Sequence, residues 1–125
     1  VHGRKKEILI KGGVNISPIA VEDALVEAFP DLAAAYVVGV EHPRWGEDVC
    51  AAVVFREEKS QDDRDAVARD IERLGSAGEI PGLSAYEAPA VVVPYSREDL
   101  PMTSTGKVQR SRLREIIQNT RPSVA

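Results

Sequence analysis

One stretch near the C-terminus carries residue types that are suited to chemistry: LPMTSTGKVQR, residues 100–110. It places a lysine amine, Lys107, directly after a glycine and three small hydroxyl residues. A Gly-Lys pair suggests a phosphate-binding loop, but that motif needs a glycine five residues before Gly106 and a Ser or Thr after the lysine. Pro101 and Val108 occupy those positions. The stretch is therefore not a phosphate-binding loop of that type.

Two interpretations of Lys107 follow from the residues alone. The first is a solvated lysine in the opening turn of a helix that begins at about Gly106, because exposed lysines are common. The second is an amine on a loop that can move, placed there for a reason other than helix stability. A cation at a helix N-terminus opposes the helix dipole, so the placement gains nothing for helix stability. The hydroxyl-rich residues before it also favour a flexible, hydrogen-bonding loop over a tight cap.

The composition limits the class of protein. Of the 125 residues, 43% are hydrophobic and 29% charged, which is typical of one globular domain. The net charge of −4 argues against a general nucleic-acid-binding protein. No apolar run approaches the ~20 residues that span a bilayer, and no charged-then-apolar leader is visible. We therefore expect no nucleic-acid partner, no membrane span and a cytoplasmic location.

Cysteine usage and charge distribution add further expectations. The single cysteine, Cys50, lies in the apolar run VCAAVVF, which predicts a buried thiol in a strand. The sequence has no histidine–cysteine cluster, so we expect no metal site of that kind. Basic residues gather at both ends: Lys11 and three others among the first 11 residues, and four more between Lys107 and Arg114. If these ends meet in space, they form a local site for an anion.

The N-terminal third is predicted to form a β-ribbon and then a helix. Residues 7–16 read as two short strands that turn at Gly12-Gly13, where positive φ costs little. Ser17 is a typical N-cap, and Pro18 follows at the first helical position. Apolar residues then recur at helical spacing until Pro30 stops the run.

The remaining elements are predicted from apolar runs and helical periodicity. Three strands are expected at 33–40, 49–55 and 90–95, and two more helices at 60–75 and 106–118. Residues 41–48 read as a polar loop, and Pro94 suggests that the last strand lies at a sheet edge. The predicted fold class is α+β: a small three-stranded sheet with about three packed helices and an N-terminal β-ribbon.

Three segments in this order resemble a known family. They are GRKKEILIKGGVNISPIAVEDAL, VVGVEHPRWGEDVCAAVV and LPMTSTGKVQRSRL, and they cover nearly all of residues 3–117. Together they resemble the C-terminal domain of the adenylate-forming superfamily, which includes acyl-CoA synthetases, peptide-synthetase adenylation domains and luciferases. The segment KGGVNISP is more similar to the acyl- or aryl-CoA ligase branch than to the amino-acid-activating branch.

The resemblance implies a catalytic role for Lys107. In this family the lysine of the TGK motif bridges the carboxylate substrate and the phosphate or ribose oxygens during adenylation, so it meets charge that develops in the transition state. The C-terminal domain then swings to a second pose for thioester formation with CoA. The implied cofactors are ATP, with Mg²⁺ bound mainly by another domain, and CoA. The implied substrate is a carboxylic acid.

The same resemblance implies roles for five further residues. Arg4 is the expected nucleotide contact, and Lys6 occupies the hinge position between the two poses. Gly12 and Gly13 match the ribbon that approaches the pantetheine channel, where the absence of side chains permits close passage. Trp45 aligns with a loop that contacts the CoA nucleotide, and stacking on adenine competes there with a partly buried structural tryptophan.

Two departures and one absence qualify the resemblance. Val14 stands where many CoA ligases have Glu, and Glu87 stands where the family often has Lys, which puts a CoA phosphate contact in doubt. The sequence contains no N-terminal adenylation domain, the domain that in this family holds the phosphate-binding loop and the acyl pocket. Residues 1–125 are thus expected to be a single swinging C-terminal domain that is inactive alone and works with its own N-terminal domain.

Two other functions stay open at this point. The chain could be a free-standing binding module that acts with a separate adenylation domain or a carrier protein. It could also be a small α+β interaction domain without nucleotide chemistry, in which case Lys107 and Arg4 have no reason to face a common partner.

Overall fold

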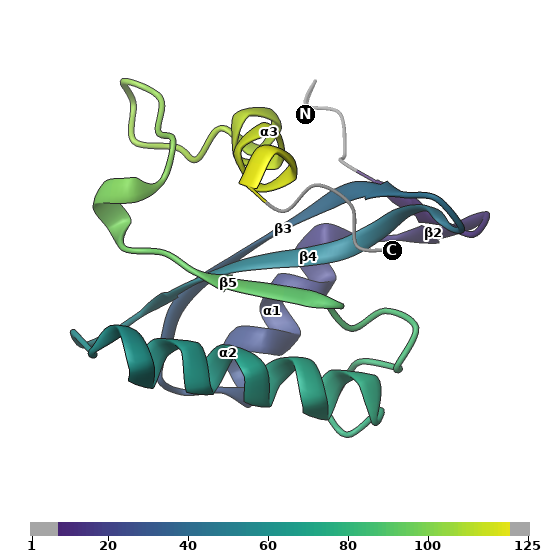
Figure 1. Cartoon of the computed structure of the whole chain (residues 1–125), viewed down its shortest axis with the longest axis horizontal. Coiled ribbons are helices and arrows are strands. Elements are labelled where there is room, and N and C mark those ends of the chain that lie inside the picture. Colours follow the sequence, from purple (N-terminus) through teal and green to yellow (C-terminus); the bar gives the residue numbers. More distant parts are fainter. Residues whose placement is uncertain (1–7, 121–125) are drawn as a thin grey trace.

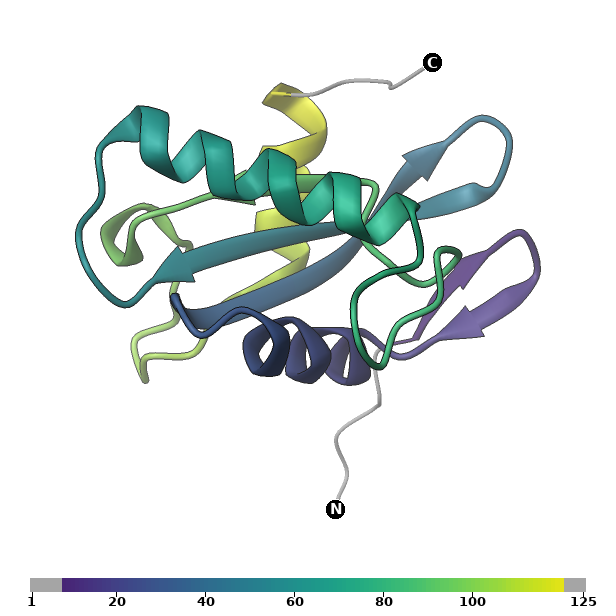
Figure 2. The same ribbon diagram turned by 90° about the horizontal axis from the view of Figure 1, so that it is seen from below.

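The computed structural model describes residues 8–120. Its elements, in chain order, are β1 (Leu9–Lys11), β2 (Val14–Ile16), α1 (Pro18–Ala28), β3 (Leu32–His42), β4 (Gly46–Phe55), α2 (Gln61–Ser76), β5 (Val91–Pro94), a 3₁₀ turn (Arg97–Asp99) and α3 (Arg110–Thr120). Figure 1 shows α1 and α2 on one side of the sheet formed by β3, β4 and β5, and α3 on the other. The ribbon of β1 and β2 lies beside the turn between β3 and β4 (Figure 2). The predicted α+β architecture is confirmed.

β4 is the central strand of the sheet. It pairs with β3 in antiparallel and with β5 in parallel orientation, so that Cys50 lies between Val38 and Val91. Because helices cover both faces, both sets of alternate β4 side chains are buried, which explains the continuous apolar run. β5 lies at the edge, as Pro94 predicted, since proline has no N–H to donate to a further strand.

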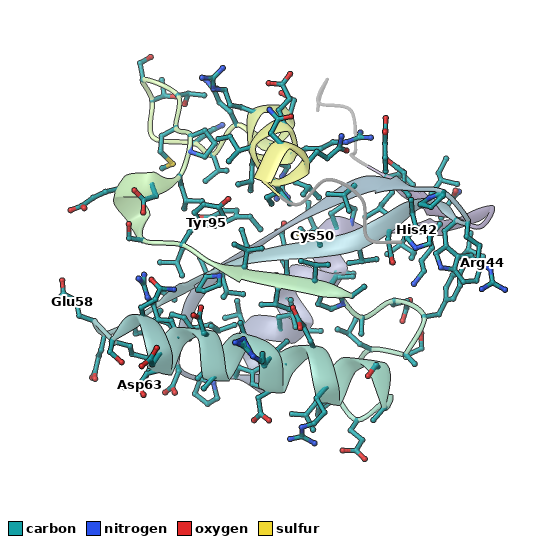
Figure 3. The ribbon with its side chains drawn as sticks, in the orientation of Figure 1. His42, Arg44, Cys50, Glu58, Asp63 and Tyr95 are labelled. Carbon is teal, nitrogen blue, oxygen red and sulfur yellow. The ribbon has the colours of Figure 1, made fainter. Side chains whose placement is uncertain are left out.

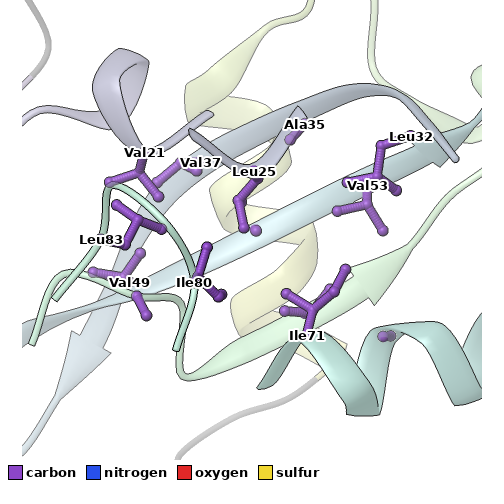
Figure 4. Packing of buried hydrophobic residues seen from close by; sticks show 14 of the residues in the cluster. Val21, Leu25, Leu32, Ala35, Val37, Val49, Val53, Ile71, Ile80 and Leu83 are labelled. Atoms are coloured by element: carbon purple, nitrogen blue, oxygen red, sulfur yellow. The ribbon is translucent and has the colours of Figure 1, made fainter. Parts of the chain in front are cut away.

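The larger hydrophobic cluster lies between the sheet and the two helices α1 and α2. Leu25 of α1 and Ile71 of α2 are fully buried there (Figure 4). They share this core with side chains from β3, β4 and the segment after α2, namely Val37, Val49, Val53, Ile80 and Leu83. Burying one such side chain contributes about 1.5–3 kcal/mol. This cluster therefore attaches both helices to the sheet.

A smaller cluster covers the opposite face. Leu113 and Ile117, one helical turn apart on α3, pack with Cys50 and its neighbours on β4. The buried thiol that the sequence predicted at Cys50 is confirmed. Tyr95 lies at the margin of this cluster (Figure 3), and its desolvation, followed by the nearby Cys50 and Asp99, raises the pKa of its hydroxyl. α3 thereby fixes the C-terminal segment to the sheet.

Serine side chains cap the two helices of the first layer. Ser17 Oγ accepts a hydrogen bond from Ala20 N at 3.3 Å, and Pro18 follows it at the first helical position, as predicted. Ser60 Oγ accepts from Asp63 N at 3.1 Å in the same way. These caps decide where α1 and α2 begin.

The predicted polar loop over residues 41–48 is too long. β3 continues to His42 and β4 begins at Gly46, so only three residues connect the strands. His42 Nδ1 accepts hydrogen bonds from Arg44 N (3.0 Å) and Trp45 N (3.2 Å), and Gly46 takes φ +84°. A side-chain cap and a left-handed glycine thus allow polar residues to continue the strands.

The last helix begins later than predicted. α3 starts at Arg110 rather than near Gly106, because an isolated β-bridge joins Met102 and Val108. Gln109 N donates to Pro101 O at 2.8 Å, which keeps the residue before α3 out of the helix. Lys107 consequently lies in a turn and not at a helix N-terminus, so the argument from the helix dipole does not apply to it.

Candidate functional site

The turn that carries Lys107 is built by residues 103–107 themselves. Thr103 N donates to Lys107 O at 2.7 Å, and Gly106 N donates back to Thr103 O at 3.0 Å. The Thr103 hydroxyl accepts from Lys107 N at 3.0 Å and lies 3.0 Å from the hydroxyl of Thr105. Gly106 takes φ +87° with no atom near its missing Cβ. The backbone of Lys107 is therefore fixed locally, while its side chain is exposed.

The base of this turn is anchored by an ion pair between helices. Arg110, three residues after Lys107, binds both carboxylate oxygens of Glu22 on α1, with Nη2 to Oε1 at 3.0 Å. Arg110 Nη1 also donates to Val37 O at 3.0 Å, and Glu22 Oε2 accepts from Val37 N at 2.7 Å. The side chains of Arg110 and Glu22 are only 22% and 12% exposed. Such bidentate pairs fix geometry as well as energy, so the turn projects from a fixed base.

The ribbon turn at Gly12 and Gly13 has the predicted left-handed backbone. The two φ angles are +56° and +86°, and Lys11 pairs with Val14 across the turn. Gly12 N donates to Trp45 O at 2.8 Å. A Cβ on Gly12 would lie 2.5 Å from the Tyr86 hydroxyl and 2.8 Å from a ring atom of Trp45, whereas one on Gly13 would meet nothing within 4 Å. Gly12 is thus packed from below, and Gly13 is the open side of the turn.

A buried lysine supports the ribbon turn. Lys11 is 7% exposed; its Nζ lies 3.1 Å from Asp48 Oδ1 and donates to Tyr86 O at 2.9 Å. Its Nζ also lies 4.5 Å from the ring centre of Tyr86, within cation–π range. Two other basic residues pair with carboxylates as well: Arg110 with Glu22, and Arg114 with Glu47 at 3.5 Å. Lys11, Arg110 and Arg114 are therefore each paired with a carboxylate and do not form an open anion site among themselves. The other basic residues near the N-terminus, Arg4, Lys5 and Lys6, lie outside the described residues.

Trp45 is half-buried and packed against its neighbours. Its ring meets Tyr86 edge-on at 5.7 Å between centres, and the Arg44 guanidinium lies 5.4 Å from its centre. Figure 3 places Arg44 and His42 together at this end of the molecule. Much of the Trp45 surface therefore packs against neighbouring residues at the ribbon turn, which favours the interpretation of Trp45 as a structural residue. Its contact with a nucleotide stays a prediction.

Two acidic residues matter to this site more than their sequence context indicated. Glu47 accepts a hydrogen bond from Ile10 N at 2.9 Å and pairs with Arg114, so it joins the ribbon to α3. Asp48 neutralises Lys11. The sequence around Glu47 and Asp48 does not reveal these roles, because the residues that they contact lie far away along the chain. A cavity of about 220 Å³ lies where the ribbon, β3 and α3 meet, and Glu47 and Arg110 help to line it.

A scan of known families matches residues 20–107 to the AMP-binding enzyme C-terminal domain. The chain belongs to this family. Similar curated proteins are CoA ligases: the peroxisomal trans-cinnamate:CoA ligase of Petunia hybrida is 34% identical over 122 residues, covering 95% of this chain and 19% of the ligase. Indoleacetate–CoA ligase of Aromatoleum aromaticum is 39% identical over 117 residues, covering 94% and 21%.

Solved structures agree with this family assignment. Apo MatB from Rhodopseudomonas palustris has a TM-score of 0.70 at 30% identity, covering 94% of this chain and 21% of that one. The Brucella canis acyl-CoA synthetase has a TM-score of 0.67 at 29% identity, covering 95% and 20%. This AMP-binding enzyme C-terminal domain thus spans about a fifth of the length of its relatives. The relatives include peroxisomal enzymes, so the cytoplasmic location stays a prediction.

The predicted site residues that the structure describes lie at two places in this AMP-binding enzyme C-terminal domain. Lys107 is the last residue of the family match, on its own turn. Gly12, Gly13 and Trp45 lie together at the other turn. Arg4 and Lys6 lie outside the described residues.

Two further findings hold for residues 8–120. No helix in this range is long and apolar enough to cross a membrane. No group of three or more His, Cys, Asp or Glu side chains there is arranged to hold a metal ion.

Proposed function

We propose that the chain is the C-terminal domain of an ATP-dependent acid–CoA ligase, acting with an N-terminal adenylation domain. In this proposal Lys107 serves formation of the acyl-adenylate, and the Gly12–Gly13 turn serves transfer of the acyl group to CoA. Family membership and the CoA ligases among the relatives support it. The observation that carries it is the exposed side chain of Lys107, the last residue of a turn whose backbone is fixed by hydrogen bonds.

The residues present fit an anionic nucleotide at Lys107. An exposed ammonium group on a fixed backbone reaches outward with little reorganisation, which is the requirement for stabilising charge that develops in a transition state. ATP supplies the phosphoanhydride that activates the acid. Lys107 would bind and orient the reacting oxygens, while Mg²⁺ and the acyl pocket would belong to the N-terminal domain.

The residues also fit the close approach of a narrow substrate arm to the ribbon turn. Gly13 has no atom within 4 Å of its missing Cβ, so its surface is open. CoA supplies the thiol that accepts the acyl group. Arg4 as a nucleotide contact, Lys6 as the hinge and Trp45 as a CoA contact remain part of this proposal.

A second acceptor chemistry has a specific observation in its favour. The amide bond synthetase McbA from Marinactinospora thermotolerans matches this chain with a TM-score of 0.69 at 29% identity. Family membership is therefore compatible with an amine acceptor in place of CoA. The same scaffold also suits the alternative of a free-standing module that meets a separate adenylation domain or a carrier protein.

Two half-reactions measured on one enzyme preparation test the proposal. The complete enzyme, meaning this chain with its adenylation domain, is assayed for ATP–pyrophosphate exchange and for transfer from a supplied acyl-adenylate to CoA. In Lys107→Ala, exchange should fall by about 10²–10³, as for the loss of one preorganised donor, and transfer should be unchanged. Lys59→Ala, at a lysine that pairs with Asp31, is the matched control.

Three results would contradict the proposal. Exchange that survives intact in Lys107→Ala would make Lys107 a solvated surface residue. Turnover by the purified 125-residue chain alone would contradict its dependence on an N-terminal domain. For the hinge, Lys6→Pro should impair transfer far more than exchange, because proline fixes φ near about −65°; an equal loss of both would reject that role.

A further inference from the structure

The ribbon turn rests on a cluster of four residues, Lys11, Trp45, Asp48 and Tyr86, which we term the lysine cluster. The Lys11 and Asp48 side chains are 8% and 12% exposed and lie 3.1 Å apart. The amine also donates to Tyr86 O at 2.9 Å and faces the Tyr86 and Trp45 rings at 4.5 and 5.6 Å. The ammonium group is thus surrounded by one carboxylate, one carbonyl and two aromatic faces.

Burial alone does not require a lysine at this position. Leu9 and Ile16, on the same face of the ribbon, are buried without charge. Replacing a buried ion pair by apolar residues of similar size is often neutral or stabilising, so such a pair is weak evidence for stability. The pair fixes the position and orientation of the Lys11 side chain, because the ammonium group must contact Asp48 and the Tyr86 carbonyl at the same time.

The lysine cluster acts on the backbone of the glycine turn. The Tyr86 hydroxyl donates to Lys11 O, and Gly12 N donates to Trp45 O at 2.8 Å. The peptide unit between Lys11 and Gly12 is therefore held from both sides. The Tyr86 hydroxyl and the Trp45 ring also fill the space that a Gly12 side chain would need. Any shift of Lys11 would move the tip of the turn.

We propose that Lys11 and Asp48 are positioning residues for the acceptor step, because their buried ion pair holds the Gly12–Gly13 turn where the acceptor passes. This inference rests on the proposed function, which assigns the turn to that step. Neither side chain touches substrate, since both are enclosed beneath the turn. The pair acts through the Gly12 backbone and leaves adenylation alone.

The test is the double variant Lys11→Met/Asp48→Asn in the complete enzyme. It removes both charges together, so no buried charge is left without a partner, and the amide that replaces the Asp48 carboxylate keeps an oxygen for the bond from Val49 N. Transfer from a supplied acyl-adenylate to CoA should slow by at least about tenfold, since misplacement of about 1 Å can cost about 10²-fold. ATP–pyrophosphate exchange should be unchanged.

The matched control is Lys59→Met/Asp31→Asn. This second lysine–aspartate pair has its nitrogen and oxygen 3.7 Å apart, and its lysine faces the Phe55 ring at 6.0 Å. Glu58 and Asp63, which flank Lys59 in the sequence, lie at the opposite end of the molecule from Arg44 (Figure 3). Both half-reactions should be unchanged in the control. The proposal is overturned if the control loses as much transfer activity as Lys11→Met/Asp48→Asn. It is also overturned if Lys11→Met/Asp48→Asn loses transfer and ATP–pyrophosphate exchange equally.

A milder variant keeps the test decisive if the double variant folds poorly. Tyr86→Phe removes only the hydroxyl that donates to Lys11 O and leaves the ring beside the ammonium group. It should slow acyl transfer by a smaller factor than the double variant does, and it should leave ATP–pyrophosphate exchange unchanged. Transfer at the wild-type rate in the double variant, or in Tyr86→Phe where the double variant does not fold, contradicts the inference.

Hydrogen exchange separates this inference from the proposed function. In the complete protein, peptides covering residues 9–16 should exchange amide hydrogens faster in Lys11→Met/Asp48→Asn, while peptides from α2 should not. If the wild-type protein performs neither half-reaction, the proposed function fails. Faster amide hydrogen exchange at residues 9–16 in the double variant would still support the role of the Lys11–Asp48 pair in holding the turn. Amide hydrogen exchange at the wild-type rate in residues 9–16 of the double variant refutes that role.

Discussion

The Gly12–Gly13 turn and the Lys107 turn both place a positive-φ glycine at the tip of a short antiparallel loop, yet they are held in opposite ways. The ribbon turn is fixed from below by contacts with Trp45, Asp48 and Tyr86, which come from distant parts of the chain. The Lys107 turn is fixed by hydrogen bonds among residues no more than four positions apart. In the proposed function, the backbone of the first turn contacts the substrate, whereas in the second turn a side chain, that of Lys107, does so.

This difference suits the two proposed tasks. A surface that a substrate arm passes closely needs an exact backbone position, and tertiary contacts supply it at the tip. A long cationic side chain needs only a fixed origin and free space, and a locally built turn supplies both. The Lys107 turn is anchored lower down, where Arg110 binds Glu22. The comparison predicts which substitutions should affect stability, and which only one half-reaction.

The largest effect on stability is expected from Gly12→Ala. A Cβ there meets the Tyr86 hydroxyl at 2.5 Å and the Trp45 ring at 2.8 Å, in a backbone with φ +56°. Left-handed strain of about 1–2 kcal/mol adds to about 1–3 kcal/mol for overpacking. Urea unfolding of the chain measures the change. Gly13→Ala, whose Cβ meets nothing, should cost only the strain; equal costs at the two glycines would show that the tip is not packed.

A smaller effect is expected from Glu22→Gln, which removes the charge that Arg110 binds. The cost is about 1.5–3 kcal/mol for hydrogen bonds to a charged group, nearer the lower figure because Arg110 is 22% exposed. Glu72→Gln is the control, since Glu72 Oε2 accepts from Val92 N at 2.7 Å much as Glu22 Oε2 accepts from Val37 N. Unfolding free energies should separate the two variants. Equal values would remove the special role of the Arg110 anchor.

Gly106→Ala tests whether the Lys107 turn is free of tertiary packing at its glycine. The φ angle is +87° and no atom lies within 4 Å of the added Cβ. The expected cost is the left-handed strain alone, about 1–2 kcal/mol, the same as for Gly13→Ala. A cost as large as that of Gly12→Ala would contradict the contrast between the two turns.

The smallest effect is expected from Thr103→Val, which removes the acceptor for Lys107 N without changing the shape of the side chain much. A neutral hydrogen bond contributes about 0.5–1.5 kcal/mol, so ATP–pyrophosphate exchange in the complete enzyme should slow by a few fold. Thr103→Ser keeps the hydroxyl and should restore the rate. The rate of acyl transfer to CoA should not change in either variant. A slower transfer would show that the Lys107 turn also serves the second half-reaction.

Local sequence predicted the elements of this domain better than their ends. The glycine pair, the Ser17–Pro18 start and the apolar run of β4 each determine structure through neighbouring residues, and all three were confirmed. The start of α3 was misplaced because the Met102–Val108 bridge competes with the helix for the residues between them. The polar residues Glu41, His42, Glu47 and Asp48 carry no local strand signal, because pairing with the opposite strand places them in β3 and β4.

The sequence by itself determined the α+β class, the Gly12–Gly13 turn and the exposed Lys107, because φ preference, capping and hydrophobic periodicity act over a few residues. The turn at Gly106 was decided by the Met102–Val108 bridge, where the sequence predicts the start of a helix. The resemblance that it carries also determined the family. Only the tertiary structure decided that Lys11 is buried against Asp48, 37 positions away, and that Arg110 binds Glu22, 88 positions away. A charged residue carries no local signal for its partner; folding selects the partner by bringing two charges together where water is excluded.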